Sequence, residues 1–353
     1  MNNITGFFLT LVAGASVGFS MWPLKWVRTL KWENFWLLYA IFSLIVVPFG
    51  LAFAVLPHLG AAYASLTLHQ ILQPLLLGIL WGFAQLGAGI CVHRLGLAVS
   101  GAVVNGVAAA FGTIIPLISL HRDMTLAISG LLILIGTGLM LTGAGFCGWS
   151  GYLREAEARQ QDHGAGFGQE QTAMRQVSVA NSTYLLTLGI AAGSGIFASL
   201  LNIALAYGDD ILKSAQGHGA QVSWAPFAVW PIALLGGSVA NIAYSVYLLN
   251  KNKTWRRFKD LSFKEVMNPF FAACLWMAGI ALYSSGTTFL GSLGISIGFG
   301  VFMITMIISG QLAGLMTGEW RFMKPGTYRS FALGVAILVL AVLTIGTSKY
   351  LQK

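Results

Sequence analysis

Long apolar segments, separated by short polar ones, recur along the whole chain. An apolar run of about 18 or more residues can cross a bilayer as a helix, and helices are expected there because backbone polar groups in lipid must be satisfied within the segment. Ten such runs cover residues 4–22, 35–56, 74–93, 95–119, 124–147, 182–207, 224–250, 268–287, 291–316 and 328–349. The sequence therefore predicts an all-α membrane protein with ten transmembrane helices.

The composition agrees with this interpretation. Of the 353 residues, 56% are hydrophobic and 9% are charged, whereas soluble proteins carry about 25% charged residues. The three cysteines, Cys91, Cys147 and Cys274, lie in or beside apolar runs without metal-ligand spacing. We expect no disulfide framework, no metal and no cofactor.

The basic residues separate by side when the spans are counted alternately. Of the 20 lysines and arginines, 16 fall on one side of the membrane. The other side carries Arg122, Lys213, Lys349 and Lys353. Loops rich in Lys and Arg face the cytoplasm, so both termini are expected outside. The formal net charge of +9 is explained by these loops, and nucleic-acid binding is not expected because no basic stripe lies on a soluble domain.

A glycine-rich segment occurs twice. Shifted by 198 residues, Leu95-Gly96 falls on Leu293-Gly294 and Gly112 falls on Gly310. A polar linker at 151–181 separates a first half, 1–150, from a second half, 182–353, with five predicted spans in each. An odd number of spans turns the second half over, which predicts two five-helix inverted repeats, as in secondary transporters with a substrate site at the midplane. The alternative is chance likeness between glycine-rich membrane helices.

Uncharged polar and aromatic side chains at membrane depth are the candidates for binding a substrate. They are Trp81, Gln85, Asn105, Asn202, Trp276 and Tyr283. Amides can bond sugar hydroxyls and an aromatic face suits the C–H side of a sugar, so this set favours a neutral polyhydroxylated ligand. The alternative is hydrogen bonding between helices.

None of the eleven carboxylates lies in the middle of a predicted span. Charges there are costly and are kept for function, so a coupled proton would have to be carried nearer an interface. The candidates in the coupling role are His69, Asp209, Asp210 and Glu319, with Glu33, His58 and His93 also near span ends. The alternative for each is a solvated group at a helix end.

Three stretches resemble a known family. They are GASVGFSMWPLKWVRTLKWENFWLLYAIFSLIVVPF at 14–49, LWGFAQLGAGICVHRLGLAVSGAVVNGVAAAFGTIIPLI at 80–118 and GQLAGLMTGEWR at 310–321. They look like the L-rhamnose–proton symporter family of the drug/metabolite transporter superfamily, whose members have ten helices in a five-plus-five inverted repeat. The resemblance implies uptake of a deoxyhexose with protons across a bacterial inner membrane.

The sequence thus predicts a secondary active transporter that moves a small neutral sugar, L-rhamnose or a related deoxyhexose, by alternating access with proton symport. Direct ATP drive is not expected because no phosphate-binding loop is present. Two alternatives stay open: a transporter or exporter of another small metabolite, and a membrane-embedded enzyme acting on a lipid-linked substrate through His69, Asp209 or Asp210. The expected partners are the sugar, H⁺ and membrane lipid, and the oligomeric state is left open.

Overall fold

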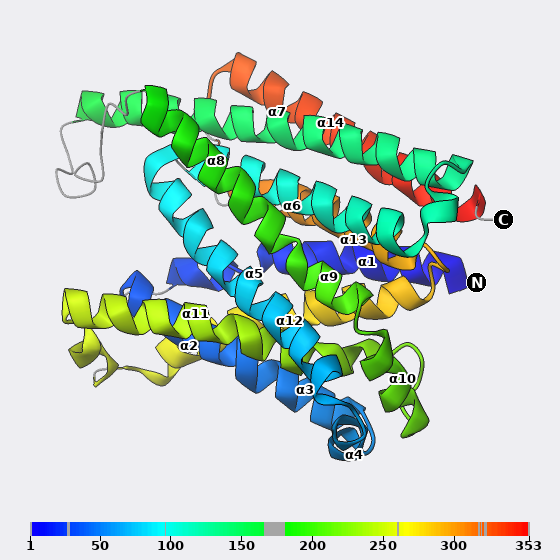
Figure 1. Cartoon of the computed structure of the whole chain (residues 1–353). Coiled ribbons are helices and arrows are strands. Elements are labelled where there is room, and N and C mark those ends of the chain that lie inside the picture. Colours follow the sequence, from blue (N-terminus) through cyan, green and yellow to red (C-terminus); the bar gives the residue numbers. More distant parts are fainter. Residues whose placement is uncertain are drawn as a thin grey trace.

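In the computed structural model the chain forms a bundle of long helices, most of them running in a similar direction and crossed obliquely by α5 and α8 (Figure 1). The structure describes residues 2–26, 29–95, 97–165, 181–259, 261–316, 318, 320 and 323–351. Every regular element in these ranges is helical. The elements of the first part are α1 (Asn2–Phe19), η1 (Trp22–Trp26), α2 (Trp32–Ile41), η2 (Phe42–Val46), α3 (Val47–Val55), α4 (Leu59–Ala64), α5 (Leu68–Leu95), α6 (Leu97–Leu120), η3 (Arg122–Met124) and α7 (Ile128–Ala165). Those of the second part are α8 (Asn181–Ala198), α9 (Leu200–Ala206), α10 (Asp209–Gly217), η4 (Ala225–Ala228), α11 (Val229–Asn252), η5 (Trp255–Phe258), α12 (Phe263–Thr288), α13 (Gly294–Met316), α14 (Pro325–Ser348) and η6 (Lys349–Leu351).

Within the described residues, nine helical segments are long and apolar enough to cross a membrane. They are Trp32–Val55, Leu68–Cys91, Val99–Leu120, Ile128–Arg154, Leu185–Gly217, Ala225–Asn252, Phe263–Thr288, Gly294–Met316 and Pro325–Leu351. The first predicted span corresponds to α1, whose apolar part, Ile4–Phe19, is shorter than these nine. The chain is therefore a multi-pass helical membrane protein.

Two of the segments are interrupted. The span over Trp32–Val55 contains a π-helical turn, η2, directly before Pro48, which has no N–H to bond the carbonyl of Leu44 four residues earlier. The span that begins with α8 turns at Ser199 and continues as α9. Such interruptions occur often at functional sites, and the structure places polar or pocket-lining side chains at both.

Helices distant in sequence pack closely through glycines. The helix α1 packs against α12 and α13, and α8 packs against α5 and α6. The pairs α5–α11 and α7–α14 are also in contact. A Cβ atom at Gly82 would lie 2.7 Å from the carbonyl oxygen of Gly237, and one at Gly334 would lie 2.9 Å from the amide nitrogen of Cys147. Small residues thus let these backbones approach, as they do in membrane bundles generally.

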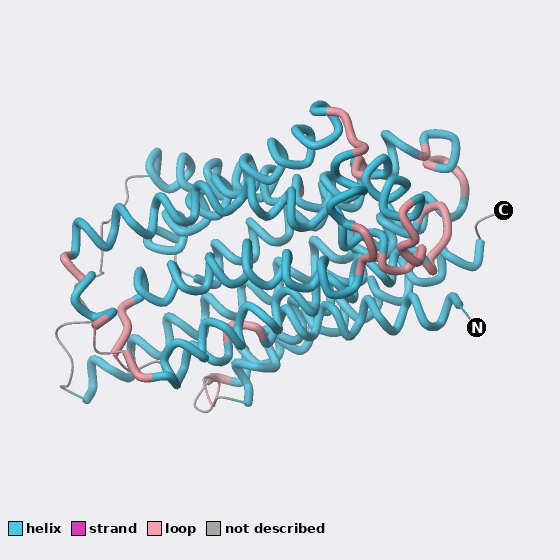
Figure 2. The backbone as a smooth tube through the Cα atoms, turned by 90° about the horizontal axis from the view of Figure 1, so that it is seen from below, coloured by secondary structure: helices cyan, strands magenta, loops and turns pink. Residues whose placement is uncertain are grey.

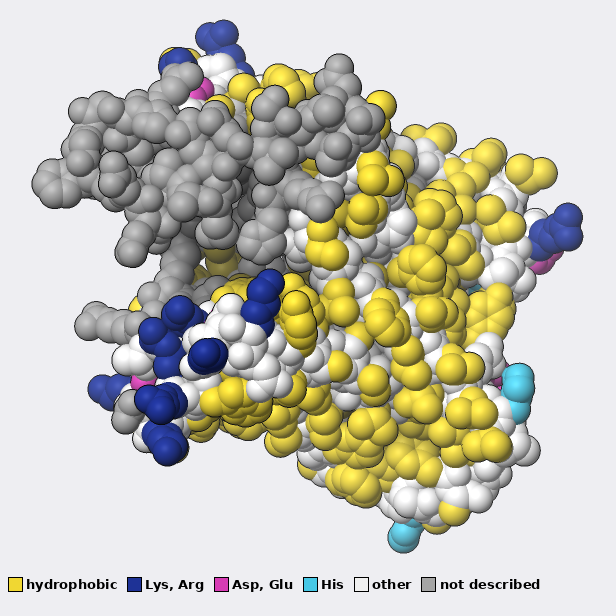
Figure 3. Space-filling model, turned by 60° about the vertical axis from the view of Figure 1, so that its left-hand side comes forward, with side chains coloured by type: hydrophobic (Ala, Val, Ile, Leu, Met, Phe, Trp, Pro, Cys, Tyr) yellow, Lys and Arg dark blue, Asp and Glu magenta, His cyan; other side chains and the backbone are white. Residues whose placement is uncertain are grey.

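The two termini lie at the same end of the bundle (Figures 1 and 2). We call this the terminal end. At the opposite end, the last turn of α11, the connection to α12 and the first turn of α12 carry Lys251, Lys253, Arg256, Arg257 and Lys264. Figure 3 shows Lys and Arg side chains gathered on this part of the molecule. We call this the basic end.

A carboxylate fixes the start of α14 at the basic end. Glu157, on α7, accepts hydrogen bonds from the backbone N–H of Lys324 at 2.7 Å and from the hydroxyl of Thr327 at 2.7 Å. Burial raises the pKa of Glu157, but these two hydrogen bonds and the positive charge of Lys324 lower it more, so the pKa lies below its usual value. The N-terminus of a helix favours a negative charge in this position.

Candidate functional site

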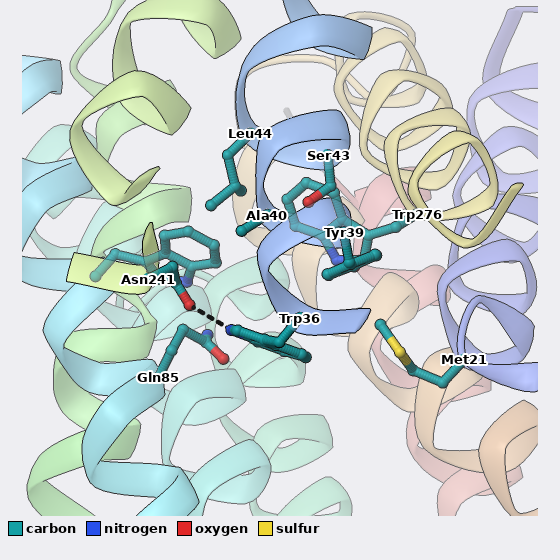
Figure 4. A pocket seen from close by; sticks show the side chains of 10 residues that line it. Met21, Trp36, Tyr39, Ala40, Ser43, Leu44, Gln85, Asn241 and Trp276 are labelled. Carbon is teal, nitrogen blue, oxygen red and sulfur yellow. Dashed lines mark hydrogen bonds between the residues drawn. The ribbon is translucent and has the colours of Figure 1, made fainter. Parts of the chain in front are cut away.

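A pocket of about 150 Å³ lies among the membrane-spanning helices. Its lining residues come from the turn after α1, from α2 and η2, and from α5, α11 and α12, and Figure 4 shows them. They are Met21, Trp36, Tyr39, Ala40, Ser43, Leu44, Trp81, Gln85, Asn241 and Trp276. Most of the lining is apolar, with a few polar groups, as is usual for sites that bind small molecules.

The polar groups of the pocket come from three helices. The indole N–H of Trp36 donates to the Asn241 side-chain oxygen at 3.1 Å (Figure 4), and the Asn241 amide donates to the carbonyl of Gly237 at 2.9 Å. The amide of Gln85 lies beside this pair (Figure 4). The hydroxyl of Ser43 is buried, and its one side-chain partner among the described residues is a weak contact with the Tyr39 hydroxyl. A buried hydroxyl that is poorly paired is costly, so Ser43 can offer a donor to a ligand.

The aromatic side of the pocket is formed by indole rings. Trp81 on α5 and Trp276 on α12 are stacked, with ring centroids 6.2 Å apart and planes at 27°. Trp36 lies 5.3 Å from Tyr39, centroid to centroid. A sugar ring presents C–H groups on its faces and hydroxyls around its edge, so a wall of indoles with amides beside it matches both parts.

The structure brings three of the six sequence-predicted ligands together. Trp81, Gln85 and Trp276 line the pocket, and the spacing of four between Trp81 and Gln85 does put them on one helix face. Asn105 is half-buried on α6 and is not among the lining residues.

Asn202 and Tyr283 lie elsewhere and contact each other. The Tyr283 hydroxyl donates to the Asn202 side-chain oxygen, and the Asn202 amide donates to the carbonyl of Gly112 at 2.7 Å. Both side chains are almost fully buried, 2% and 1% exposed. Their polar atoms are therefore occupied by the protein.

Seven lining residues were missed by sequence reasoning, and four of them are polar or aromatic: Trp36, Tyr39, Ser43 and Asn241. The spacing of the first three, i, i+3 and i+7, does place them on one face of a helix, which is the signal that could have found them. Asn241 carries no comparable signal, because its role depends on a contact with Trp36, 205 residues away in the sequence.

The coupling candidates lie away from this pocket. His69 is exposed at the start of α5. Asp209 pairs with Lys213 at 2.5 Å with both side chains well exposed, and Asp210 is exposed and accepts a hydrogen bond from Gln70 at 2.9 Å. The fourth candidate, Glu319, lies outside the described residues.

A buried carboxylate lies nearer the pocket. Glu33, in the first turn of α2, is 5% exposed. One of its oxygens accepts hydrogen bonds from the Asn252 amide at 3.1 Å and the Thr254 hydroxyl at 2.9 Å. It precedes the pocket residue Trp36 by three positions, about one helical turn.

The pocket lies between mid-depth and the basic end. Trp36 is close to the start of α2, which lies at the basic end, and Trp276 is near the middle of α12.

Comparisons with known proteins agree on one family. The family model described as L-rhamnose-proton symport protein (RhaT) matches residues 1–349. An L-rhamnose-proton symporter of Mannheimia succiniciproducens is 22% identical over 97% of both chains. The L-rhamnose-proton symporters of Escherichia coli and Shigella dysenteriae are 23% and 22% identical over 98% of both chains.

Proposed function

The chain belongs to the L-rhamnose-proton symport protein family, and on that premise we propose that it carries a small neutral sugar, L-rhamnose or a related deoxyhexose, across the bacterial inner membrane together with a proton. The observation that carries the proposal is a pocket among the membrane-spanning helices lined by indoles and neutral amides. None of its lining residues carries a formal charge, which suits a neutral ligand.

We propose that the sugar lies against Trp81 and Trp276. Its hydroxyls would bond the Gln85 amide, the Ser43 hydroxyl and the Trp36–Asn241 pair. Trp36 and Asn241 bond each other at 3.1 Å, so neither polar group is left unpaired. Asn105 remains a sequence-based candidate, whereas the polar atoms of Asn202 and Tyr283 bond each other and the carbonyl of Gly112.

We also propose ten transmembrane helices in two inverted repeats, 1–150 and 182–353, joined by a cytoplasmic linker at 151–181. In this arrangement α1 is the first span and joins the nine longer segments to make ten. The proposal is supported by the helix contacts: when each helix of one half is replaced by its equivalent in the other half, the same contacts recur. The packing of α1 on α12 and α13 corresponds to that of α8 on α5 and α6. The pair α5–α11 corresponds to the contact between α12 and α2.

Alternating access follows from such symmetry, because two equivalent halves can exchange conformations and open the site first to one side and then to the other. The positive-inside bias makes the basic end cytoplasmic and leaves both termini outside.

For the proton, we propose Glu33 ahead of His69, Asp209, Asp210 and Glu319. Glu33 combines burial with nearness in sequence to the pocket residue Trp36. The three described candidates are exposed at helix ends. The matched relatives are symporters, which favours transport over the alternative of a membrane enzyme.

The deciding experiment reconstitutes the purified protein in liposomes and follows labelled L-rhamnose. We expect uptake that a pH gradient, acid outside, drives above equilibrium. Unlabelled L-rhamnose should compete with it. Uptake that ignores the gradient would contradict proton coupling alone, and no response to L-rhamnose in either binding or uptake would contradict the substrate.

A further inference from the structure

Six basic side chains gather where α11 is joined to α12. All six are exposed, and none of them forms an ion pair within the part of the chain that the structure describes. They lie at the basic end, where Figure 3 shows Lys and Arg side chains together. We call them the basic cluster: Lys251, Lys253, Arg256, Arg257, Lys259 and Lys264.

The carboxylates beside the basic cluster are occupied by uncharged groups. Glu33 accepts a hydrogen bond from the hydroxyl of Thr254 at 2.9 Å. Glu265 accepts hydrogen bonds from the backbone N–H and the hydroxyl of Thr29. Even with Asp260, which lies outside the described residues, three carboxylates stand beside six cations. The basic cluster therefore keeps an excess of positive charge that the protein does not neutralise.

One member of the cluster holds its side chain at a cost to the backbone. Lys253 ends α11 in the left-handed conformation, with φ 54° and ψ 37°. Glycine is the usual residue at such a helix end, because a Cβ atom crowds the backbone there. The ammonium group of Lys253 is exposed and makes no hydrogen bond or ion pair within the described residues. A side chain kept at this position without a partner in the protein indicates a partner outside it.

Aromatic rings accompany the cations. Trp255 and Phe258, both in η5, lie on one face with ring centroids 5.8 Å apart, because residues three apart are aligned in a 3-10 helix. The indole N–H of Trp255 donates to the side-chain oxygen of Asn250 at 2.7 Å, which fixes the ring. Phe263, at the start of α12, is 78% exposed. Aromatic side chains at the end of a membrane span are typical of the membrane–water interface.

The position of the connection places it at the depth of the lipid headgroups. It joins the membrane-spanning segments Ala225–Asn252 and Phe263–Thr288, so it follows directly on the hydrocarbon region. It is also held in place: the Asn34 amide donates to the carbonyl of Thr254 at 3.1 Å, and Arg257 donates to the carbonyl of Thr29. A connection that is already fixed loses little conformational freedom when it binds.

We propose that the basic cluster binds the phosphate headgroup of an anionic phospholipid. Exposed lysines and arginines attract anionic lipid and form charge-assisted hydrogen bonds with phosphate oxygens. Trp255, Phe258 and Phe263 lie against the glycerol and the first carbons of the acyl chains. A soluble anion would use the charges but leave these rings without a partner, which favours a lipid.

The test compares two phospholipids that differ only in their headgroup. The purified full-length protein in dodecyl maltoside is titrated with dioleoyl phosphatidylglycerol or with dioleoyl phosphatidylcholine. Native mass spectrometry measures the fraction of protein with bound lipid. We expect phosphatidylglycerol to bind roughly tenfold more tightly, and the difference should shrink at higher ionic strength.

Two matched double variants locate the site. R256Q/K259Q removes two cations of the cluster and should weaken phosphatidylglycerol binding roughly 25-fold, a factor of about five for each basic residue near an anionic surface. K324Q/R329Q removes the same charge from exposed positions at the start of α14, outside the cluster. This control should leave the affinity nearly unchanged.

Lys253→Gly separates binding from stability. Glycine relieves the left-handed backbone, so the midpoint of thermal unfolding in detergent should not fall. Phosphatidylglycerol binding should nevertheless weaken roughly fivefold. A lower midpoint with unchanged lipid binding would show that Lys253 serves the fold and does not contact lipid.

Three outcomes would overturn the proposal. Equal affinity for the two phospholipids would remove the headgroup from recognition. Equal losses in the two double variants would assign the binding to net charge. Displacement of phosphatidylglycerol by inorganic phosphate at constant ionic strength would identify a site for a soluble anion. Because lipid binding is measured directly, none of these outcomes depends on which substrate the protein transports.

Discussion

At the scale of single residues, burial and pairing decide which polar groups are available. The hydroxyl of Tyr283 and the amide of Asn202 are committed to the protein, whereas Gln85 and Ser43 face a cavity. Buried polar groups are nearly always paired, so a weakly paired one in a cavity indicates a place for ligand. By this criterion Ser43 is a stronger candidate for a sugar contact than Asn202 or Tyr283.

The role of Glu33 can be tested by a change of one atom. Glu33→Gln keeps the oxygen that accepts from Asn252 and Thr254 and removes the charge. If Glu33 carries the coupled proton, accumulation of L-rhamnose driven by a pH gradient should fall almost to equilibration. Exchange of labelled for unlabelled L-rhamnose should continue, because exchange needs no net proton movement.

Glu157→Gln provides the control for this measurement. Glu157 is also hydrogen-bonded at the basic end, but it bonds the start of α14 and not a residue near the pocket. Gradient-driven accumulation should survive in this variant. Equal loss in both variants would assign the effect to general damage at the basic end.

At the scale of elements, glycine decides which helices can lie in contact. The pair α7–α14 meets where Gly334 faces the backbone of Cys147 and the carbonyl of Gly143. Other glycines, Gly189 and Gly193 on α8 among them, have nothing within 4 Å of an added Cβ. Small residues at regular spacing therefore form a contact only where a partner backbone is present.

This difference predicts the effect of substitution along α7 and α14. Gly334→Val should destabilise the protein by roughly 1–3 kcal/mol, because backbone atoms cannot move aside for the added atoms. Gly138→Val, at a glycine of α7 with open space around it, changes the helix propensity in the same way, but its side chain would not collide with a neighbouring helix. Thermal unfolding in detergent should show a lower midpoint for the first variant than for the second. Similar midpoints would mean that the α7–α14 crossing is not tightly packed.

At the scale of the whole molecule, the two ends differ in charge. The basic end carries the lysine and arginine cluster, and the terminal end carries both termini (Figures 1 and 3). The pocket is a property of the two assembled halves, since its lining comes from helices of both. Neither half lines it alone.

The orientation proposed for these ends has its own test. Alkaline phosphatase, which is active only outside the cytoplasm, is fused after Lys353, and green fluorescent protein is fused there in a second chain. The excess of basic residues on the opposite side predicts an active phosphatase and a dark fluorescent protein. A bright fluorescent fusion would place the termini in the cytoplasm and would contradict the proposed orientation.

The sequence by itself determined the class of this protein and most of its helices. Apolar length and the cost of unpaired backbone groups in lipid are local properties, so the runs at 95–119 and 291–316 could be recognised without a partner. It also found Trp81 and Gln85, because both lie on one face of one helix. Only the tertiary structure decided that Trp36 meets Asn241 and that Tyr283 meets Asn202. Which face of a helix meets which neighbour depends on packing between segments that lie 205 and 81 residues apart in these two cases. The order of residues along a single helix does not determine that packing.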